Sequence, residues 1–111
     1  MKIPNSIRIG GTEYPIKYVD NLNNGTNLAY GHIDYENCRI ELSATAGTAH
    51  EKQCKTMWHE ILHGIWEHMG FAIENEEEIV TVFAKGIYQV LQDNERRFFD
   101  IVDGERRTEN D

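Results

Sequence analysis

The sequence predicts a small protein of the α+β class in which strands come first and helices follow. Residues 7–42 contain short segments where apolar and polar residues alternate, which is the period of a half-buried strand. Residues 50–91 instead carry apolar residues at helical spacing. The chain has 111 residues, a length that allows one modest hydrophobic core. We therefore assign residues 1–104 to one domain and expect residues 105–111 to be a charged, disordered tail.

About four short antiparallel strands are expected in the first part of the chain. Gly10 and Gly11 offer a tight turn between the first two strands. Pro15 lacks an N–H group for the ladder, so it marks the second strand as an edge strand. Residues 21–27 are expected to form a loop, and residues 35–37 a turn into the last strand. The alternating apolar residues of these strands are Ile7, Ile9, Tyr14, Ile16, Tyr18, Cys38, Ile40 and Leu42.

Two helices are expected after the strands. Thr48 and Glu51 have the spacing of a capping box, which predicts the start of a first helix, and Gly70 supplies its left-handed stop. This helix would be about 30 Å long, so we expect it to be the central element of the domain. Asn75 is placed to begin a second helix, and the pattern breaks near residues 93–94. The apolar residues of the second helix are Val80, Phe83, Ala84, Ile87 and Leu91.

Composition excludes several classes of function. The net charge is −8, and an acidic chain lacks the positive surface that binds a phosphate backbone, so we expect no nucleic-acid partner. No apolar stretch is long enough to cross a membrane, and the polar start lacks the apolar core of a secretory signal. We therefore expect a cytoplasmic protein with no membrane partner. Cys38 and Cys54 are then expected to be reduced, buried thiols.

His59, Glu60 and His63 form the pattern H-E-x-x-H within the first predicted helix. Residues four apart lie on one face of a helix, so both imidazoles can bind the same metal ion. Neutral imidazole suits Zn²⁺, and Glu60 is placed to accept a proton from water held by that ion. The opposite face of this helix is apolar, which favours a metal site over two solvated histidines. Its apolar residues are Cys54, Met57, Trp58, Ile61 and Ile65.

A catalytic zinc site requires a third protein ligand. His68 lies about 500° around the helix from His63 and so faces nearly away from the site; we expect it to be a hydrogen-bonded residue at the helix end. Glu76, Glu77 and Glu78 open the second helix, and the first two lie on the edge that faces the first helix. The helix dipole alone also favours acidic residues there. We favour Glu77 as the third ligand, with Glu76 and Glu78 as alternatives.

These features resemble the ImmA/IrrE-like metallopeptidases and the compact zincin-like proteins of bacteriophages and prophages, which are gluzincins. The resemblance covers about residues 28–94, and its most specific part is the segment Met57–His63. The second helix is similar to the family's E-x-x-A-x-x-F-A pattern, although Val80 stands where the family has a small residue. The residues that match this second pattern in spacing are Glu77, Val80, Phe83 and Ala84.

The resemblance implies a zincin-like fold with His59, His63 and Glu77 as zinc ligands and Glu60 as general base. It also implies hydrolysis of a peptide bond. The strand Cys38–Ser43 leads into the predicted active helix, and we expect it to hold a protein or peptide substrate by strand addition. Candidate groups for stabilising the transition state are Tyr30, His32, Tyr35 and Tyr88.

The sequence therefore predicts a zinc-dependent metallopeptidase. The alternative is a catalytically silent, zinc-stabilised module of phage origin that binds a protein in the same cleft. A metal-dependent ribonuclease of the H-x-x-x-H-x-x-x-x-x-H type is a weaker third possibility, because Glu60 occupies the general-base position and the net charge is negative.

Overall fold

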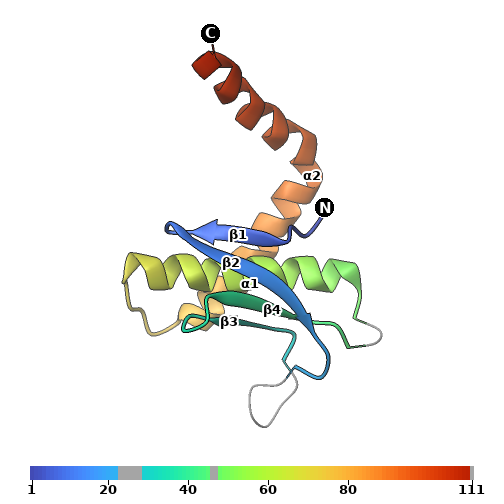
Figure 1. The fold of residues 1–111 in the computed structure, drawn as a ribbon, viewed down its shortest axis with the longest axis vertical. Coiled ribbons are helices and arrows are strands. Elements are labelled where there is room, and N and C mark those ends of the chain that lie inside the picture. Colours follow the sequence, from blue (N-terminus) through green and yellow to red (C-terminus); the bar gives the residue numbers. More distant parts are fainter. Residues whose placement is uncertain (23–28, 46–47, 111) are drawn as a thin grey trace.

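The protein consists of a four-stranded sheet followed by two helices (Figure 1). The computed structural model describes residues 1–22, 29–45 and 48–110, with side chains described as far as residue 98. The elements are β1 (Ser6–Ile9), β2 (Thr12–Val19), β3 (Gly31–Asp34), β4 (Arg39–Ser43), α1 (His50–Met69) and α2 (Glu76–Asn110). The predicted α+β class, with its N-terminal sheet and two following helices, is confirmed.

The order of the strands in the sheet is β1-β2-β4-β3. β1 pairs with β2 and β3 with β4 in antiparallel fashion, but β2 and β4 are parallel, with Ile16 opposite Ile40. The prediction of a fully antiparallel sheet is therefore wrong at this pair. Ile40 and Leu42 of β4, an inner strand, are completely buried, and β1 and β3 form the two edges of the sheet.

Pro15 lies where β2 changes partners. The residues of β2 up to Pro15 pair with β1, and those from Ile16 onward pair with β4. β2 is thus an inner strand, and its prediction as an edge strand is wrong. The Ile16 N–H donates to the carbonyl of Asn5 at 2.8 Å, so in an antiparallel ladder the nitrogen of Pro15 faces away from β1. Pairing with β4 starts one residue later, at Ile16, so neither neighbouring strand needs an N–H donor at Pro15.

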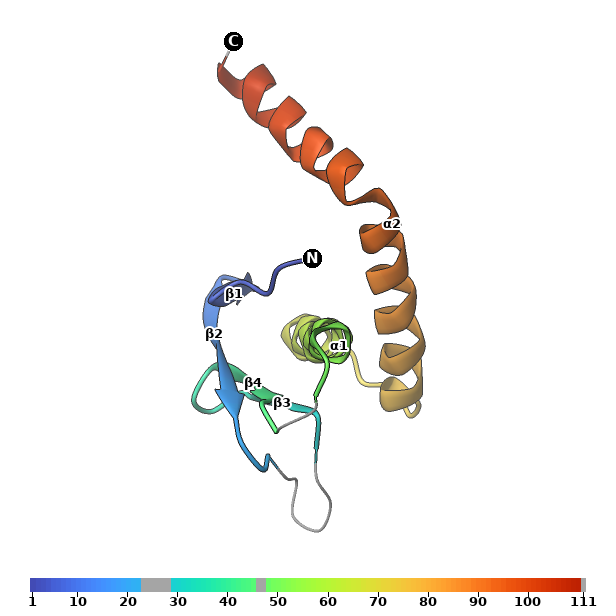
Figure 2. The ribbon, with the colours of Figure 1, turned by 90° about the vertical axis from the view of Figure 1, so that its right-hand side faces the viewer.

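Helix α1 packs against one face of the sheet and forms the middle layer of the molecule, with α2 on its other side (Figure 2). Gly64 lets the helix approach closely, because a Cβ there would lie 2.9 Å from the Cδ1 atoms of Ile9 and Ile33. The buried core between sheet and helix consists of Ile9, Tyr14, Ile16, Ile33, Ile40, Leu42, Met57 and Ile61.

Of the two predicted ends of α1, the C-terminal one is confirmed and the N-terminal one is wrong. Gly70 has a φ of 68°, and its N–H donates to the carbonyls of Trp66 and Glu67, which confirms the predicted stop. The predicted capping box is wrong: the N-cap is Ala49, and no side chain caps the helix. Thr48 precedes that position by one residue, so its hydroxyl is out of register with the first turn.

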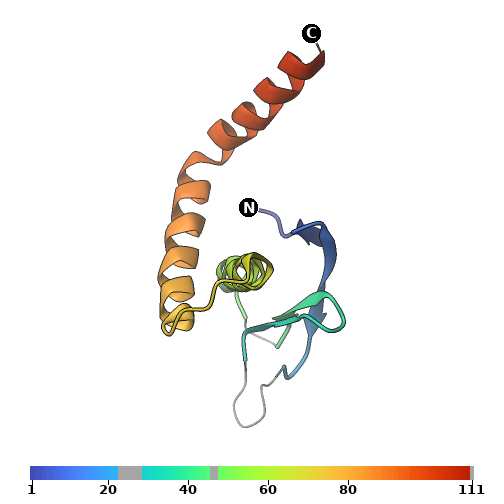
Figure 3. The ribbon, with the colours of Figure 1, turned by 90° about the vertical axis from the view of Figure 1, so that its left-hand side faces the viewer.

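Helix α2 crosses α1 at an angle and then bends away from the body of the protein (Figure 3). Its buried residues, Val80, Ala84 and Tyr88, are spaced four apart and form the packed face. Asn94 has non-helical angles (φ −129°, ψ 20°), which confirms the predicted break. The helical backbone continues through Asn110, and disorder of residues 105–111 in solution stays a prediction. None of the described helices is long and apolar enough to span a membrane.

The remaining local predictions concern the connections and the cysteines. Residues 35–37 do turn the chain, held by hydrogen bonds from Asn37 to the Asp34 carboxylate. Most of the loop predicted over residues 21–27 lies outside the described residues. Cys54 is buried as expected, whereas Cys38 is only half-buried; both are free thiols.

Candidate metal centre

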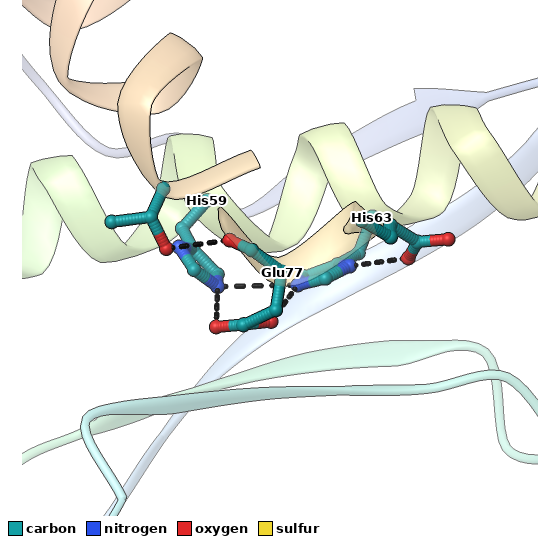
Figure 4. Close-up of polar contacts among 5 residues, drawn as sticks. His59, His63 and Glu77 are labelled. Carbon is teal, nitrogen blue, oxygen red and sulfur yellow. Dashed lines mark hydrogen bonds and ion pairs between the residues drawn. The ribbon is translucent and has the colours of Figure 1, made fainter. Parts of the chain in front are cut away.

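His59 and His63 project from one face of α1 toward the start of α2 (Figure 4). Their Nε2 atoms lie 3.2 Å apart, and the two rings meet edge to face with centroids 4.8 Å apart. The i,i+4 spacing thus has the effect predicted from the sequence, because one turn of helix separates the two residues.

Glu77 lies in the first turn of α2 and reaches both imidazoles with one carboxylate. Its Oε1 is 3.0 Å from Nε2 of His59, and its Oε2 is 2.7 Å from Nε2 of His63. One ligand atom from each of these three residues lies within 4.8 Å of the others, so the group could bind a metal ion. The structure therefore brings together the three residues that were predicted as ligands.

No protein-family model matches the chain, and neither a curated protein nor a solved structure matches it significantly. The resemblance to the ImmA/IrrE-like metallopeptidases therefore stays a prediction that depends on the motif residues themselves. The arrangement of His59, His63 and Glu77 supports a metal-binding group without naming the ion.

Glu76 contributes a contact that the sequence prediction missed. Its Oε2 lies 2.7 Å from Nδ1 of His63, on the opposite side of the ring from Glu77. A histidine that binds a metal commonly donates its second ring N–H to such a carboxylate, which fixes the tautomer and the orientation of the ring. The sequence did place Glu76 on the edge of the second helix that faces the first helix. It was predicted there as an alternative metal ligand and not as a hydrogen-bond partner of His63.

The two histidines differ in their electrostatic surroundings. Burial lowers the pKa of His59, and the nearby Glu77 carboxylate offsets this only in part. Burial acts in the same direction on His63, but hydrogen bonds to Glu76 and Glu77 outweigh it, so the pKa of His63 is raised. His59 therefore favours the neutral form that binds metal, whereas His63 holds a proton more strongly until a cation replaces it.

Glu60 lies beside the histidines with only 7% of its surface exposed. Burial raises the pKa of this carboxyl to about 7, and the neighbouring Glu77 carboxylate adds to the effect. The charge of His63 and a hydrogen bond from the backbone N–H of Ile33 act in the opposite direction. A carboxyl group with a pKa near neutrality can both accept and return a proton.

The metal-binding group opens into a cleft of about 580 Å³ between α1, α2 and β3. Of the four candidate stabilising residues, Tyr30 and His32 line this cleft. Tyr35 and Tyr88 are not among the described lining residues; Tyr88 is buried on the packed face of α2. Tyr30 and His32 are therefore the candidates that can reach a bound molecule.

The strand beside the cleft is β3, which forms the edge of the sheet. The prediction that Cys38–Ser43 holds the substrate is wrong, because β4 is paired on both sides and has no free edge. Gly31 allows β3 to lie close to α1: a Cβ at this position would overlap Cγ2 of Thr56 and lie 3.4 Å from Cγ of Glu60. The exposed backbone edge therefore lies directly beside the candidate base.

His68 takes no part in the site. It lies on another face of α1, where its exposed ring packs against Gly10 in the β1–β2 turn. The hydrogen bond predicted for His68 is not found within the part of the chain that the structure describes. Its exclusion from the metal-binding group follows from the helical geometry, as predicted.

Proposed function

We propose that the protein is a zinc-dependent metallopeptidase with His59, His63 and Glu77 as ligands. The observation that carries this proposal is the convergence of these side chains next to the buried Glu60 in an open cleft. Two imidazole nitrogens and one carboxylate oxygen are a donor set used by catalytic zinc sites, which leave a further position open.

The spacing of the donor atoms supports zinc. Tetrahedral coordination with Zn–N bonds of about 2.0–2.1 Å places two ligand nitrogens about 3.3 Å apart. The Nε2 atoms of His59 and His63 are 3.2 Å apart, and the Glu77 oxygens lie 2.7 and 3.0 Å from them. The spacing of the two histidines therefore matches that of two zinc ligands, whereas the Glu77 contacts are hydrogen bonds that an ion would replace.

Glu60 is the proposed general base. Zinc bound by the three ligands would supply Lewis-acid chemistry, acidifying water and polarising a carbonyl. Glu60 accepts the proton of the attacking water and returns it to the leaving amine as the peptide bond breaks. Its carboxyl group is buried beside both histidines and lines the same cleft, so it lies next to the position where water would be held.

The edge of β3 is the proposed binding surface for an extended peptide. The outer edge of β3 has no partner strand, so a substrate can pair there as an added strand, although the Ile33 N–H is already hydrogen-bonded to Glu60. Residues of β3 line the same cleft as His59 and Glu60. A peptide on this edge would lie across the metal-binding group.

Metal analysis followed by a cleavage assay tests the proposal. Protein purified without chelator should contain about one zinc per chain by elemental mass spectrometry, and Glu77→Ala should lose most of it. Glu78→Ala is the matched control, because Glu78 is an exposed neighbour on the same helical turn outside the metal-binding group.

Glu60→Gln then separates the enzyme from the binding module. It should keep the zinc and lose cleavage of a peptide library, monitored by mass spectrometry, by about 10²-fold or more. Zinc-loaded wild-type protein that cuts no peptide would instead support the catalytically silent module. Absence of zinc from the wild type after incubation with the metal would contradict both.

A further inference from the structure

A group of three lysines lines one end of the cleft. Lys52 and Lys55 belong to α1, and Lys85 belongs to α2. The sequence contains only two other lysines, Lys2 and Lys17, and neither lines the cleft. In a chain with a net charge of −8, most of the lysines thus face one cavity. We call Lys52, Lys55 and Lys85 the lysine group.

The lysine group lies beyond the metal-binding residues along both helices. Lys55 and Lys52 precede His59 by one and two turns of α1, which places them about 6 and 10 Å along the axis. Lys85 follows Glu77 by about two turns on α2, or about 12 Å. The two helices present their lysines at the same end, since Lys55 Nζ lies 5.6 Å from the ring of Tyr88, close to Lys85 in α2.

Little negative charge opposes the lysine group. Lys55 forms an ion pair with Glu51 at 3.2 Å, while Lys52 lies 4.3 Å from the ring of Tyr30. Lys85 is exposed and has no ion-pair partner within the described residues. Among the described residues, the ion pair with Glu51 is the only one that these three lysines form, and the cleft carboxylates Glu60 and Glu77 belong to the metal-binding end, so the lysine end is positively charged and suits an anion.

The direction of β3 determines which part of a peptide would meet these lysines. Gly31 lies against Thr56, and Ile33 further along β3 lies against Gly64, so β3 runs in the same direction as α1. A peptide that pairs antiparallel to β3, the commoner arrangement, runs the opposite way along α1. Its residues on the C-terminal side of the metal-binding group therefore lie toward the lysine group.

We propose that the lysine group binds a carboxylate of the peptide, located on the C-terminal side of the scissile bond. At about 3.3 Å per residue, the distance along the helices corresponds to two to four residues beyond that bond. The carboxylate belongs to an Asp or Glu side chain or to the free C-terminus of the peptide. This assignment rests on the proposed peptidase function, because the position of the carboxylate is counted from the bond that the enzyme cleaves.

Cleavage mapping on synthetic peptides tests the assignment and separates the two sources. C-terminally amidated peptides with Asp or Asn placed two to four residues after the cleaved bond test side-chain carboxylates. Peptides without acidic residues, with free or amidated ends, test the terminal carboxylate. In one of these two comparisons, Asp against Asn or free against amidated C-terminus, wild-type protein should cleave the peptide with the carboxylate with a kcat/KM about tenfold higher.

Lys52→Gln/Lys85→Gln removes two exposed charges and keeps the ion pair of Lys55. It should retain the wild-type zinc content and reduce the preference for carboxylate-bearing peptides close to unity. Lys17→Gln is the matched control, an exposed lysine on β2 away from the cleft, and should keep the wild-type preference. Equal cleavage of acidic and neutral peptides, or a preference confined to the N-terminal side, would overturn the assignment.

Binding to Glu60→Gln supplies a readout that needs no cleavage. Zinc-loaded Glu60→Gln should bind fluorescent acidic peptides about tenfold more tightly than neutral ones in anisotropy titrations, and adding Lys52→Gln/Lys85→Gln should remove the difference. Equal affinities would overturn the carboxylate site. A clear difference together with no cleavage by wild type would overturn the peptidase function while supporting carboxylate binding.

Discussion

His63 Nδ1 lies 2.7 Å from Oε2 of Glu76, and this contact determines which nitrogen of the ring faces the metal-binding group. An ionised carboxylate can only accept hydrogen bonds, so Nδ1 carries the proton. By the same rule Nε2 donates to the Glu77 carboxylate, 2.7 Å away, and gives up this proton when a cation binds there. Glu76 thereby prepares His63 to act as a ligand through Nε2.

Replacement of Glu76 should weaken metal binding without abolishing it. Glu76→Ala removes the group that fixes the tautomer and orientation of His63, and such losses reduce metal affinity by about 10–100-fold. Competition with a chromophoric chelator measures the affinity, and Glu78→Ala on the same turn serves as the control. Identical zinc affinities of Glu76→Ala and wild type would show that the contact has no positioning role.

The histidines of α1 should differ sharply in their effect on zinc. His63→Ala should lose most of the bound metal, because it removes a donor atom from the metal-binding group. His68→Ala should retain about one zinc per chain, since that ring packs against Gly10 instead. Elemental analysis of both variants is decisive: loss of zinc from His68→Ala would require a different ligand set.

Glu60 should make the metal-free protein less stable as the pH rises. Its pKa is raised from 4.5 to about 7, so the folded protein binds a proton that the unfolded chain releases between these values. The stabilising effect of the protonated carboxyl is present below pH 4.5 and is lost as the pH rises through 7. Between pH 5 and 8 the change amounts to about 2–3 kcal/mol.

Urea unfolding of metal-free protein at several pH values measures this dependence. Glu60→Gln cannot titrate at this position, so its free energy of unfolding should fall less than that of wild type over the same pH range. Parallel pH profiles for the two proteins would contradict the assignment of the raised pKa to Glu60.

Gly31 should tolerate no side chain unless Thr56 is reduced in size. Gly31→Ala introduces a Cβ that overlaps Cγ2 of Thr56, and overpacking of this kind costs about 1–3 kcal/mol. Adding Thr56→Ser removes that methyl group and keeps the hydroxyl that donates to the Lys52 carbonyl. Thermal and urea unfolding should show partial rescue in the double variant; additive losses would mean that the steric explanation is incorrect.

Local periodicity was sufficient to predict α1 and the shared face of its two histidines, although Ile65, predicted on the apolar face, is exposed. The i,i+4 spacing of His59 and His63 and the stop at Gly70 depend on residues within one or two helical turns. Placement of Glu77 followed from the same reasoning applied to the next helix. Glu76 was harder to assign, because helical geometry places it near α1 but does not indicate which atom of His63 it contacts.

Strand order depends on contacts that periodicity does not encode. Residues of β2 and β4 alternate in the same way whether they pair in parallel or not, so the alternation does not indicate that these two strands are neighbours. The mistaken substrate strand followed from this error, since an edge is defined by the whole sheet. The capping box failed for a smaller reason: Thr48 lies one residue before the true N-cap.

The parallel pairing of Ile16 with Ile40 also has a consequence for folding kinetics. The β1–β2 and β3–β4 hairpins can each form between neighbours in sequence, but they join only after a long loop has closed, at a cost in chain entropy. His63 and Glu77, by contrast, are 14 positions apart on consecutive helices. The metal-binding group and the β3–β4 hairpin beside it can therefore assemble through local contacts, whereas the β1–β2 hairpin joins the sheet only in the slow, non-local step.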